Sequence, residues 1–247
     1  MLRLLRLTKT YTAHEPFPLA QWIGHEARIM ASCRLNELLR NGEFTQSFHE
    51  EVDAELAEHE SAGTVGVRGM YGGLRWYLPW SASEWPLLKN PLLRPFAITN
   101  KAFVFERYNA MASTISEPYK TAKPIIDVHN PLMNPIVRFL GNDDFARQNT
   151  LDGRRCFDRA IAHSRCLRIL NAMAKKKNFN ADLNSLRLPE ECLIDPMNGE
   201  RLRVKQTPNG PIVYSVGADL SDDGGRVNAP TGPYDVGFGP VKSAGKQ

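Results

Sequence analysis

The sequence predicts an α+β fold that is mostly helical, with a small β-structure near the C-terminal end. Four stretches carry apolar residues at helical spacing, and two short stretches after residue 200 alternate in polarity. A length of 247 residues with 42% hydrophobic and 23% charged residues is sufficient for a buried core. The net charge of +4 is too small to indicate nucleic-acid binding, so we expect no nucleic-acid partner.

A helical hairpin is expected at the start of the chain. Residues 18–40 place apolar side chains on one face, and Asn41 and Gly42 supply a left-handed stop. Residues 43–61 then repeat the pattern, with apolar residues on one side and glutamates on the other. A turn of two or three residues would join two such helices as antiparallel neighbours.

Residues 62–97 are irregular and rich in glycine, proline and tryptophan, which predicts short helices around turns. Their aromatic cluster either fills the core or forms a surface for a partner, because tryptophan clusters mark both packed interiors and binding grooves. The residues of this possible partner surface are Trp76, Tyr77, Trp80 and Trp85.

The longest helix is expected over residues 143–177. Before it, residues 98–116 are again periodic, and four prolines between positions 118 and 135 indicate a long connection. We therefore expect a helical region over residues 1–141, followed by a second module over residues 142–225.

A β-hairpin should follow the long helix, with strands at residues 202–206 and 212–216 and a turn at Asn209 and Gly210. The alternation suggests that Leu202 and Val204 face Ile212, Tyr214 and Val216, with the Tyr214 ring packed on the long helix. Residues 226–247 are rich in glycine, proline, lysine and serine, so we expect a disordered tail there.

An acidic loop after the hairpin is the main candidate site. Asp219, Asp222 and Asp223 precede Gly224 and Gly225, which allow a tight turn with inward carbonyls. Calcium prefers such hard oxygen ligands, and close carboxylates repel one another unless a cation or hydrogen-bond donors neutralise them. The spacing is not that of an EF-hand. The alternative is a solvated turn in which aspartates cap backbone amides.

Another aspartate, Asp195, precedes Pro196 and should accept amides of the turn that ends at Gly199. This turn, the strand after it, and the run from Tyr214 through Asp219 to Gly225 resemble a known family. They are similar to the C-terminal segment of a planctomycete-type envelope protein family, itself similar to the major pseudopilin of type II secretion systems.

The resemblance covers residues 155–225 and implies a long helix, a hairpin, a calcium-binding loop at Asp219, Asp222 and Asp223, and a place in the cell envelope. Met197 and Arg201 stand where family members commonly carry Phe and Pro. Family members usually begin with a membrane anchor, whereas no apolar run of about 18 residues occurs here. An upstream anchor segment is therefore one expectation that the resemblance raises.

Enzyme signatures are missing from the sequence: it contains no H-E-x-x-H, G-x-S-x-G, Walker or Rossmann motif. The four cysteines lack a C-x-x-C pair and are expected to be free thiols. The first hypothesis is a non-enzymatic envelope-associated structural or interaction protein, with a calcium-stabilised C-terminal module. The alternative is a hydrolase, or a lipid- or ligand-binding helical domain, with a cleft near the Trp cluster and polar groups from Glu106, Asp127 or His129.

Overall fold

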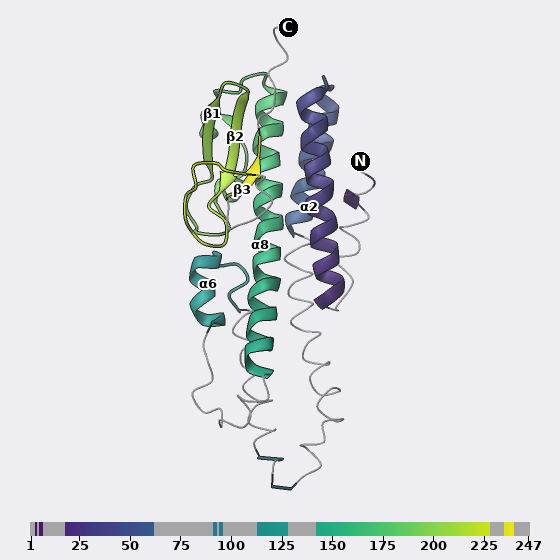
Figure 1. Cartoon of the computed structure of the whole chain (residues 1–247). Coiled ribbons are helices and arrows are strands. Elements are labelled where there is room, and N and C mark those ends of the chain that lie inside the picture. The colour runs from purple at the N-terminus through teal and green to yellow at the C-terminus, as the bar shows by residue number, and fades with distance from the viewer. Residues whose placement is uncertain are drawn as a thin grey trace.

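A computed structural model of the chain is shown in Figure 1. The described residues are 18–61, 113–127, 142–227 and 235–239, with residues 3, 5, 6, 91, 92, 94 and 95. The elements are α2 (Pro18–Asn41), α6 (Tyr119–Ile126), α8 (Asn142–Lys175), η1 (Leu183–Leu186), α9 (Glu190–Leu193), β1 (Arg203–Thr207), β2 (Gly210–Ser215) and β3 (Val236–Phe238). A further helix spans residues 46–61. The predicted α+β class with mostly helical content is confirmed.

The helical hairpin forms where the sequence predicts it. Helix α2 ends at Asn41, and the Gly42 amide donates a hydrogen bond of 3.0 Å to the Leu38 carbonyl. The expected left-handed stop is wrong, because the φ of Gly42 is not in the left-handed region; a Cβ at Gly42 would instead approach the Phe44 ring to 2.6 Å. The next helix begins at residue 46 because Thr45 caps it: the Thr45 hydroxyl accepts the Phe48 amide at 3.3 Å. The joining turn therefore covers residues 42–45.

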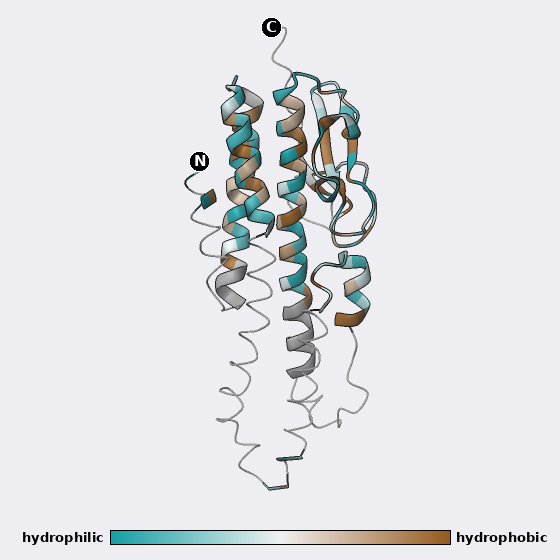
Figure 2. Cartoon of the chain, turned by 180° about the vertical axis from the view of Figure 1, so that it is seen from behind, coloured by the Kyte–Doolittle hydropathy of each residue, from teal (hydrophilic) through white to brown (hydrophobic). Residues whose placement is uncertain are grey.

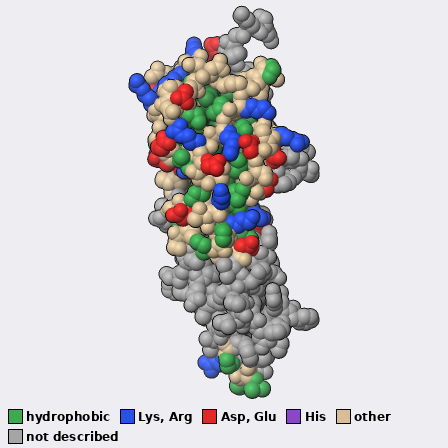
Figure 3. All heavy atoms as spheres, turned by 90° about the vertical axis from the view of Figure 1, so that its left-hand side faces the viewer, with side chains coloured by type: hydrophobic (Ala, Val, Ile, Leu, Met, Phe, Trp, Pro, Cys, Tyr) green, Lys and Arg blue, Asp and Glu red, His purple; other side chains and the backbone are tan. Residues whose placement is uncertain are grey.

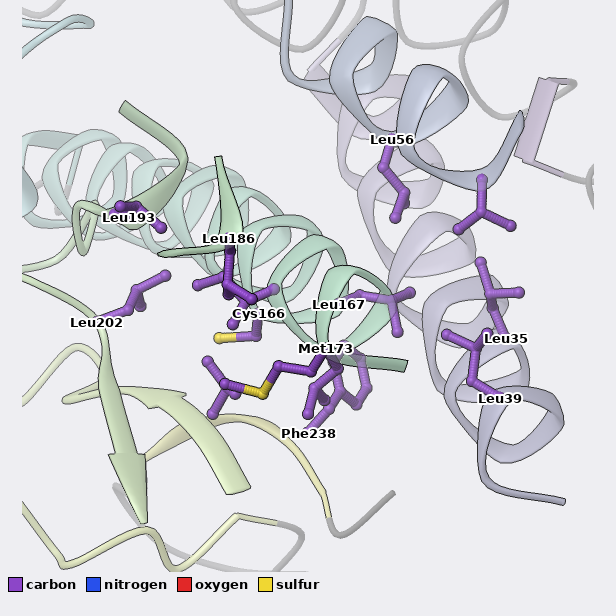
Figure 4. Close-up of a cluster of buried hydrophobic side chains, with 14 of the residues drawn as sticks. Leu35, Leu39, Leu56, Cys166, Leu167, Met173, Leu186, Leu193, Leu202 and Phe238 are labelled. Atoms are coloured by element: carbon purple, nitrogen blue, oxygen red, sulfur yellow. The ribbon is translucent and has the colours of Figure 1, made fainter. Parts of the chain in front are cut away.

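Helix α8 is the central element, with α2 on one side and the sheet and α6 on the other (Figures 1 and 2). One continuous core joins these layers, and Figure 4 shows side chains from the helices and the sheet meeting around α8. Its buried members include Leu35, Leu56, Leu167, Leu170, Leu202, Val213 and Phe238. The core thus crosses the boundary expected between residues 141 and 142. Among the described residues, no helix has the length and apolar character needed to span a membrane.

The sheet is antiparallel in the order β1-β2-β3, and its register differs from the expected facing by one residue. Val204 is opposite Val213, and Val213 lies in the core against α8. Alternation along the strand therefore places Ile212 and Tyr214 on the outer face. The expectation that the Tyr214 ring packs on α8 is wrong. Both faces of β2 carry apolar side chains, and the loop that holds Asp222 and Gly225 covers the outer face.

The expectation of a disordered tail is wrong where strand β3 forms. Residues 235–239 lie within the tail expected at 226–247, yet Val236–Phe238 pairs with β2. Gly237 lies opposite Tyr214, and a Cβ at Gly237 would approach the Val213 carbonyl oxygen to 2.2 Å. The close approach of the two strands explains the glycine. Residues 228–234 and 240–247 lie outside the described residues.

Helix α6 occupies part of the expected long connection, so that expectation is wrong over residues 119–126. The amides of Tyr119 and Lys120 donate to the carbonyls of Pro196 and Met197, at 2.9 and 2.8 Å. The helix contains Pro124, which removes an internal hydrogen bond. Tertiary contacts at its N-terminus therefore stabilise a segment whose local sequence indicates a break.

Candidate functional site

Asp195 joins the Pro196 turn to the end of β2. Its buried carboxylate accepts the Met197 amide at 2.8 Å and the Ser215 hydroxyl at 2.7 Å on one oxygen. The other oxygen accepts the Val216 amide at 3.0 Å. Burial raises the pKa of the Asp195 carboxyl, and these three donors oppose the shift. The predicted role in the turn is confirmed, and the link to β2 extends it.

Gly199 closes the same turn against α6. Its φ of +78° lies in the left-handed region, and its amide donates to the Asp195 carbonyl at 2.9 Å. A Cβ at this position would approach Pro118 Cγ to 2.8 Å. Both the backbone conformation and the nearness of the proline that precedes α6 therefore favour glycine here.

The acidic loop lies over the outer face of the hairpin. Asp222 accepts the Tyr214 hydroxyl at 3.2 Å and the Gly224 amide at 2.8 Å, and its other oxygen pairs with Arg203 Nε at 3.1 Å. Burial, followed by the Asp222 charge, raises the pKa of Tyr214 to about 12. Lys205 Nζ adds a hydrogen bond of 2.6 Å to the Gly224 carbonyl. Figure 3, which views the molecule from this side, shows cationic and anionic side chains interspersed.

The three predicted calcium ligands have different surroundings. Asp219 is exposed and accepts the Ser221 amide at 3.2 Å. Asp223 is half-buried, and its Oδ2 is shielded from solvent with no hydrogen-bond partner. Within the described part of the chain, no group of three or more His, Cys, Asp or Glu side chains is arranged to hold a metal ion. The loop therefore holds suitable oxygens without a preformed cage.

Asp235 belongs to this loop in space and was missed by the sequence analysis. Its buried carboxylate accepts the amides of Asp223 and Gly225, at 3.3 and 2.7 Å. Burial raises its pKa, and the negative charges of Asp222 and Asp223 add to the shift. The available signal was the alternating run directly after Asp235, which the surrounding glycines and prolines obscured.

The remaining predicted residues do not form a site in the described structure. Asp127 follows α6, where its amide donates to the Lys123 carbonyl at 2.8 Å. The four cysteines are free thiols, as expected. The partner-surface residues and two candidate polar groups of the enzyme hypothesis lie outside the described residues: Trp76, Tyr77, Trp80, Trp85, Glu106 and His129.

The fold and the site define a mostly helical α+β chain with a loop-covered hairpin. Comparison with known proteins adds no relative: no protein family, curated protein or solved structure matches the chain.

Proposed function

We propose that this chain is a non-enzymatic, envelope-associated structural or interaction protein whose C-terminal module is stabilised by calcium. The observation that carries the calcium proposal is the Asp223 carboxylate, which has a buried oxygen without a donor. The negative charges of Asp222 and Asp223 also act on buried Asp235. An unsatisfied buried acceptor costs roughly 1–3 kcal/mol, and more when it is charged. A bound cation would remove that cost.

The structural role is supported by how the module uses its buried polar side chains. Arg154 on α8 binds Asp158 at 2.6 Å and donates to the carbonyls of Thr114 and Glu117, at 2.9 and 2.5 Å. Asp195 likewise ties a turn to a strand. In both cases a buried charge joins segments that are distant in sequence, which favours a scaffold function.

Calcium would be held by carboxylates of Asp219, Asp222 and Asp223 and by carbonyls of the loop. When bound, it would supply positive charge to a set of oxygens that repel one another. Arg203 already neutralises one oxygen of Asp222, so an ion would compete with a side chain. We therefore expect weak binding, with a Kd of about 10⁻⁴–10⁻³ M as in extracellular modules.

Thermal melts of the full chain in calcium and in EGTA test the proposal. At about 10 mM calcium, such a Kd corresponds to roughly 2 kcal/mol, or a Tm increase of about 4–7 °C for a chain of this size. Asp223→Asn should remove most of this increase. The exposed Asp182→Asn, on the loop before η1, serves as the matched control and should respond as wild type does. An unchanged Tm for wild type would contradict the calcium proposal.

A variant of Arg203 distinguishes a loop that binds calcium from a loop whose permanent counter-ion is Arg203. The Arg203 Nε pairs with Asp222 and its Nη2 with Glu200, each at 3.1 Å, so this guanidinium is the competing counter-ion for the loop. If calcium binds, Arg203→Met should enlarge the calcium-dependent increase in Tm, because a competing cation is lost. If Arg203 is the permanent counter-ion, Arg203→Met lowers the Tm and calcium does not restore it.

A further inference from the structure

Two histidines are buried, one on each helix of the contact between α2 and α8: His25 lies on α2 and meets α8, and His163 lies on α8 and meets β3. His25 on α2 is 2% exposed, and neither of its ring nitrogens has a hydrogen-bond partner. It contacts the Phe157 ring on α8 edge-on at 5.7 Å. His163 on α8 is 6% exposed, its Nδ1 is also without a partner, and its ring lies 4.8 Å from the Phe238 ring on β3.

A buried arginine is close enough to both rings for its charge to act on them. Arg28 on α2 is 1% exposed, and it bridges the layers by donating to Ser164 Oγ on α8 at 2.6 Å and to the His59 carbonyl at 3.1 Å. Both acceptors are neutral. The Arg28 charge disfavours protonation of His25 and His163. The contact therefore holds one buried cation near two imidazoles: His25 has no acceptor, whereas the backbone of Arg159 partly favours the charged form of His163.

Other charged and titratable groups face this cluster from each neighbouring helix. On the helix over residues 46–61, these are His59 and Glu60. Glu60 is already paired with Arg165 and Arg168, at 3.1 and 3.2 Å. On α8, Arg159 acts on His163 with a further positive charge, and β3 presents the Phe238 ring. Protonated histidines would therefore meet mainly positive charge and apolar surface.

We propose that the contact between α2 and α8 is an acid-sensitive latch, in which protonation of His25 and His163 beside Arg28 releases α2. The turn around Asp195 and the β1–β2 hairpin stay folded. Opening places the His25 ring and the Arg28 guanidinium in water, where charge is well solvated, whereas the His163 ring keeps its contact with Phe238 on β3. The latch does not depend on calcium.

The sign and size of the effect follow from linkage. Burial, with Arg28 or Arg159 adding to it, lowers the pKa of both His25 and His163 to about 3. The ordinary pKa is about 6.5, so the open form takes up protons first, and the closed form loses stability as pH falls below that value. Between pH 7 and pH 5, the fully solvated His25 ring should increase the opening constant about 25-fold, and His163, which stays in contact with Phe238, should add a smaller factor.

Hydrogen exchange of the full chain at pH 7 and pH 5, corrected for the intrinsic exchange rate, measures this opening. Amides of residues 23–39 should show an increase of about 25-fold or more, whereas those of β2 should change little. His25→Phe should reduce the increase by about 25-fold, and His163→Phe should reduce it by a smaller factor. Ile29→Val, a buried control on α2, should raise opening equally at both pH values and leave the ratio unchanged.

Two outcomes would overturn the latch. One is a parallel loss of protection in α2 and β2, which would indicate global unfolding. The other is an unchanged pH 5 to pH 7 ratio in both histidine variants. If either variant fails to fold, ring NMR of wild type decides: the rings should stay neutral until α2 opens, and titration near pH 6.5 with α2 still protected would refute the proposal.

Discussion

Replacing Asp195 with Asn tests the buried hydrogen bonds that join the Pro196 turn to the end of β2. The carboxylate accepts three donors, from Met197, Ser215 and Val216. An Asn side chain has one acceptor oxygen, so its amide nitrogen would face the Val216 amide as donor to donor. Losing a hydrogen bond to a charged group costs roughly 1.5–3 kcal/mol, and a buried unsatisfied amide costs roughly 1–3 kcal/mol.

The burial that raises the pKa of Asp195 offsets part of this loss, because the neutral Asn is easier to desolvate. We therefore expect Asp195→Asn to lower the free energy of unfolding by about 2–4 kcal/mol. Urea unfolding followed by circular dichroism, with an unchanged m-value, measures it. The exposed Asp182→Asn should stay within about 0.5 kcal/mol of wild type. A loss below about 1 kcal/mol in Asp195→Asn would refute the reasoning.

Two further predictions concern the sheet and its loop. Gly237→Ala should lower the free energy of unfolding by about 2 kcal/mol or more, because its Cβ would meet the Val213 carbonyl oxygen at 2.2 Å. On α8, a Cβ at Gly153 would meet no atom within 4 Å, so Gly153→Ala should raise the free energy of unfolding by about 0.5–1 kcal/mol. Urea unfolding compares the two glycine variants, and equal effects would contradict the close approach of β3 to β2 at Gly237. Tyr214→Phe should cost about 1 kcal/mol through the lost bond to Asp222, and alkaline absorbance titration of wild type should place one tyrosine pKa near 12.

Local signals in the sequence were sufficient for the helical hairpin, for α8 and for the existence of the β1–β2 hairpin. The stop at Gly42 and the turn at Asn209 and Gly210 are each encoded within a few residues. The role of Asp195 in its own turn was predictable for the same reason, since the Met197 amide is only two positions away. These features depend on neighbours along the chain.

Features that depend on tertiary contacts were not predictable. Strand β3 forms because β2 offers it a partner, and α6 forms because the turn at Pro196 accepts its first amides. The outer face of β2 was misassigned because the acidic loop buries Tyr214 on the side away from α8. The same distance in sequence hid Asp235, which approaches the loop only when β3 is in place.

Isothermal titration of calcium into the full chain tests the central claim most directly. The account predicts about one ion per chain, with a Kd of about 10⁻⁴–10⁻³ M, and loss of the binding heat in Asp223→Asn but not in Asp182→Asn. A folded wild-type chain that gives no binding heat up to about 10 mM calcium would contradict the account. The same titration curve in Asp223→Asn as in wild type would place the ion elsewhere and contradict it equally.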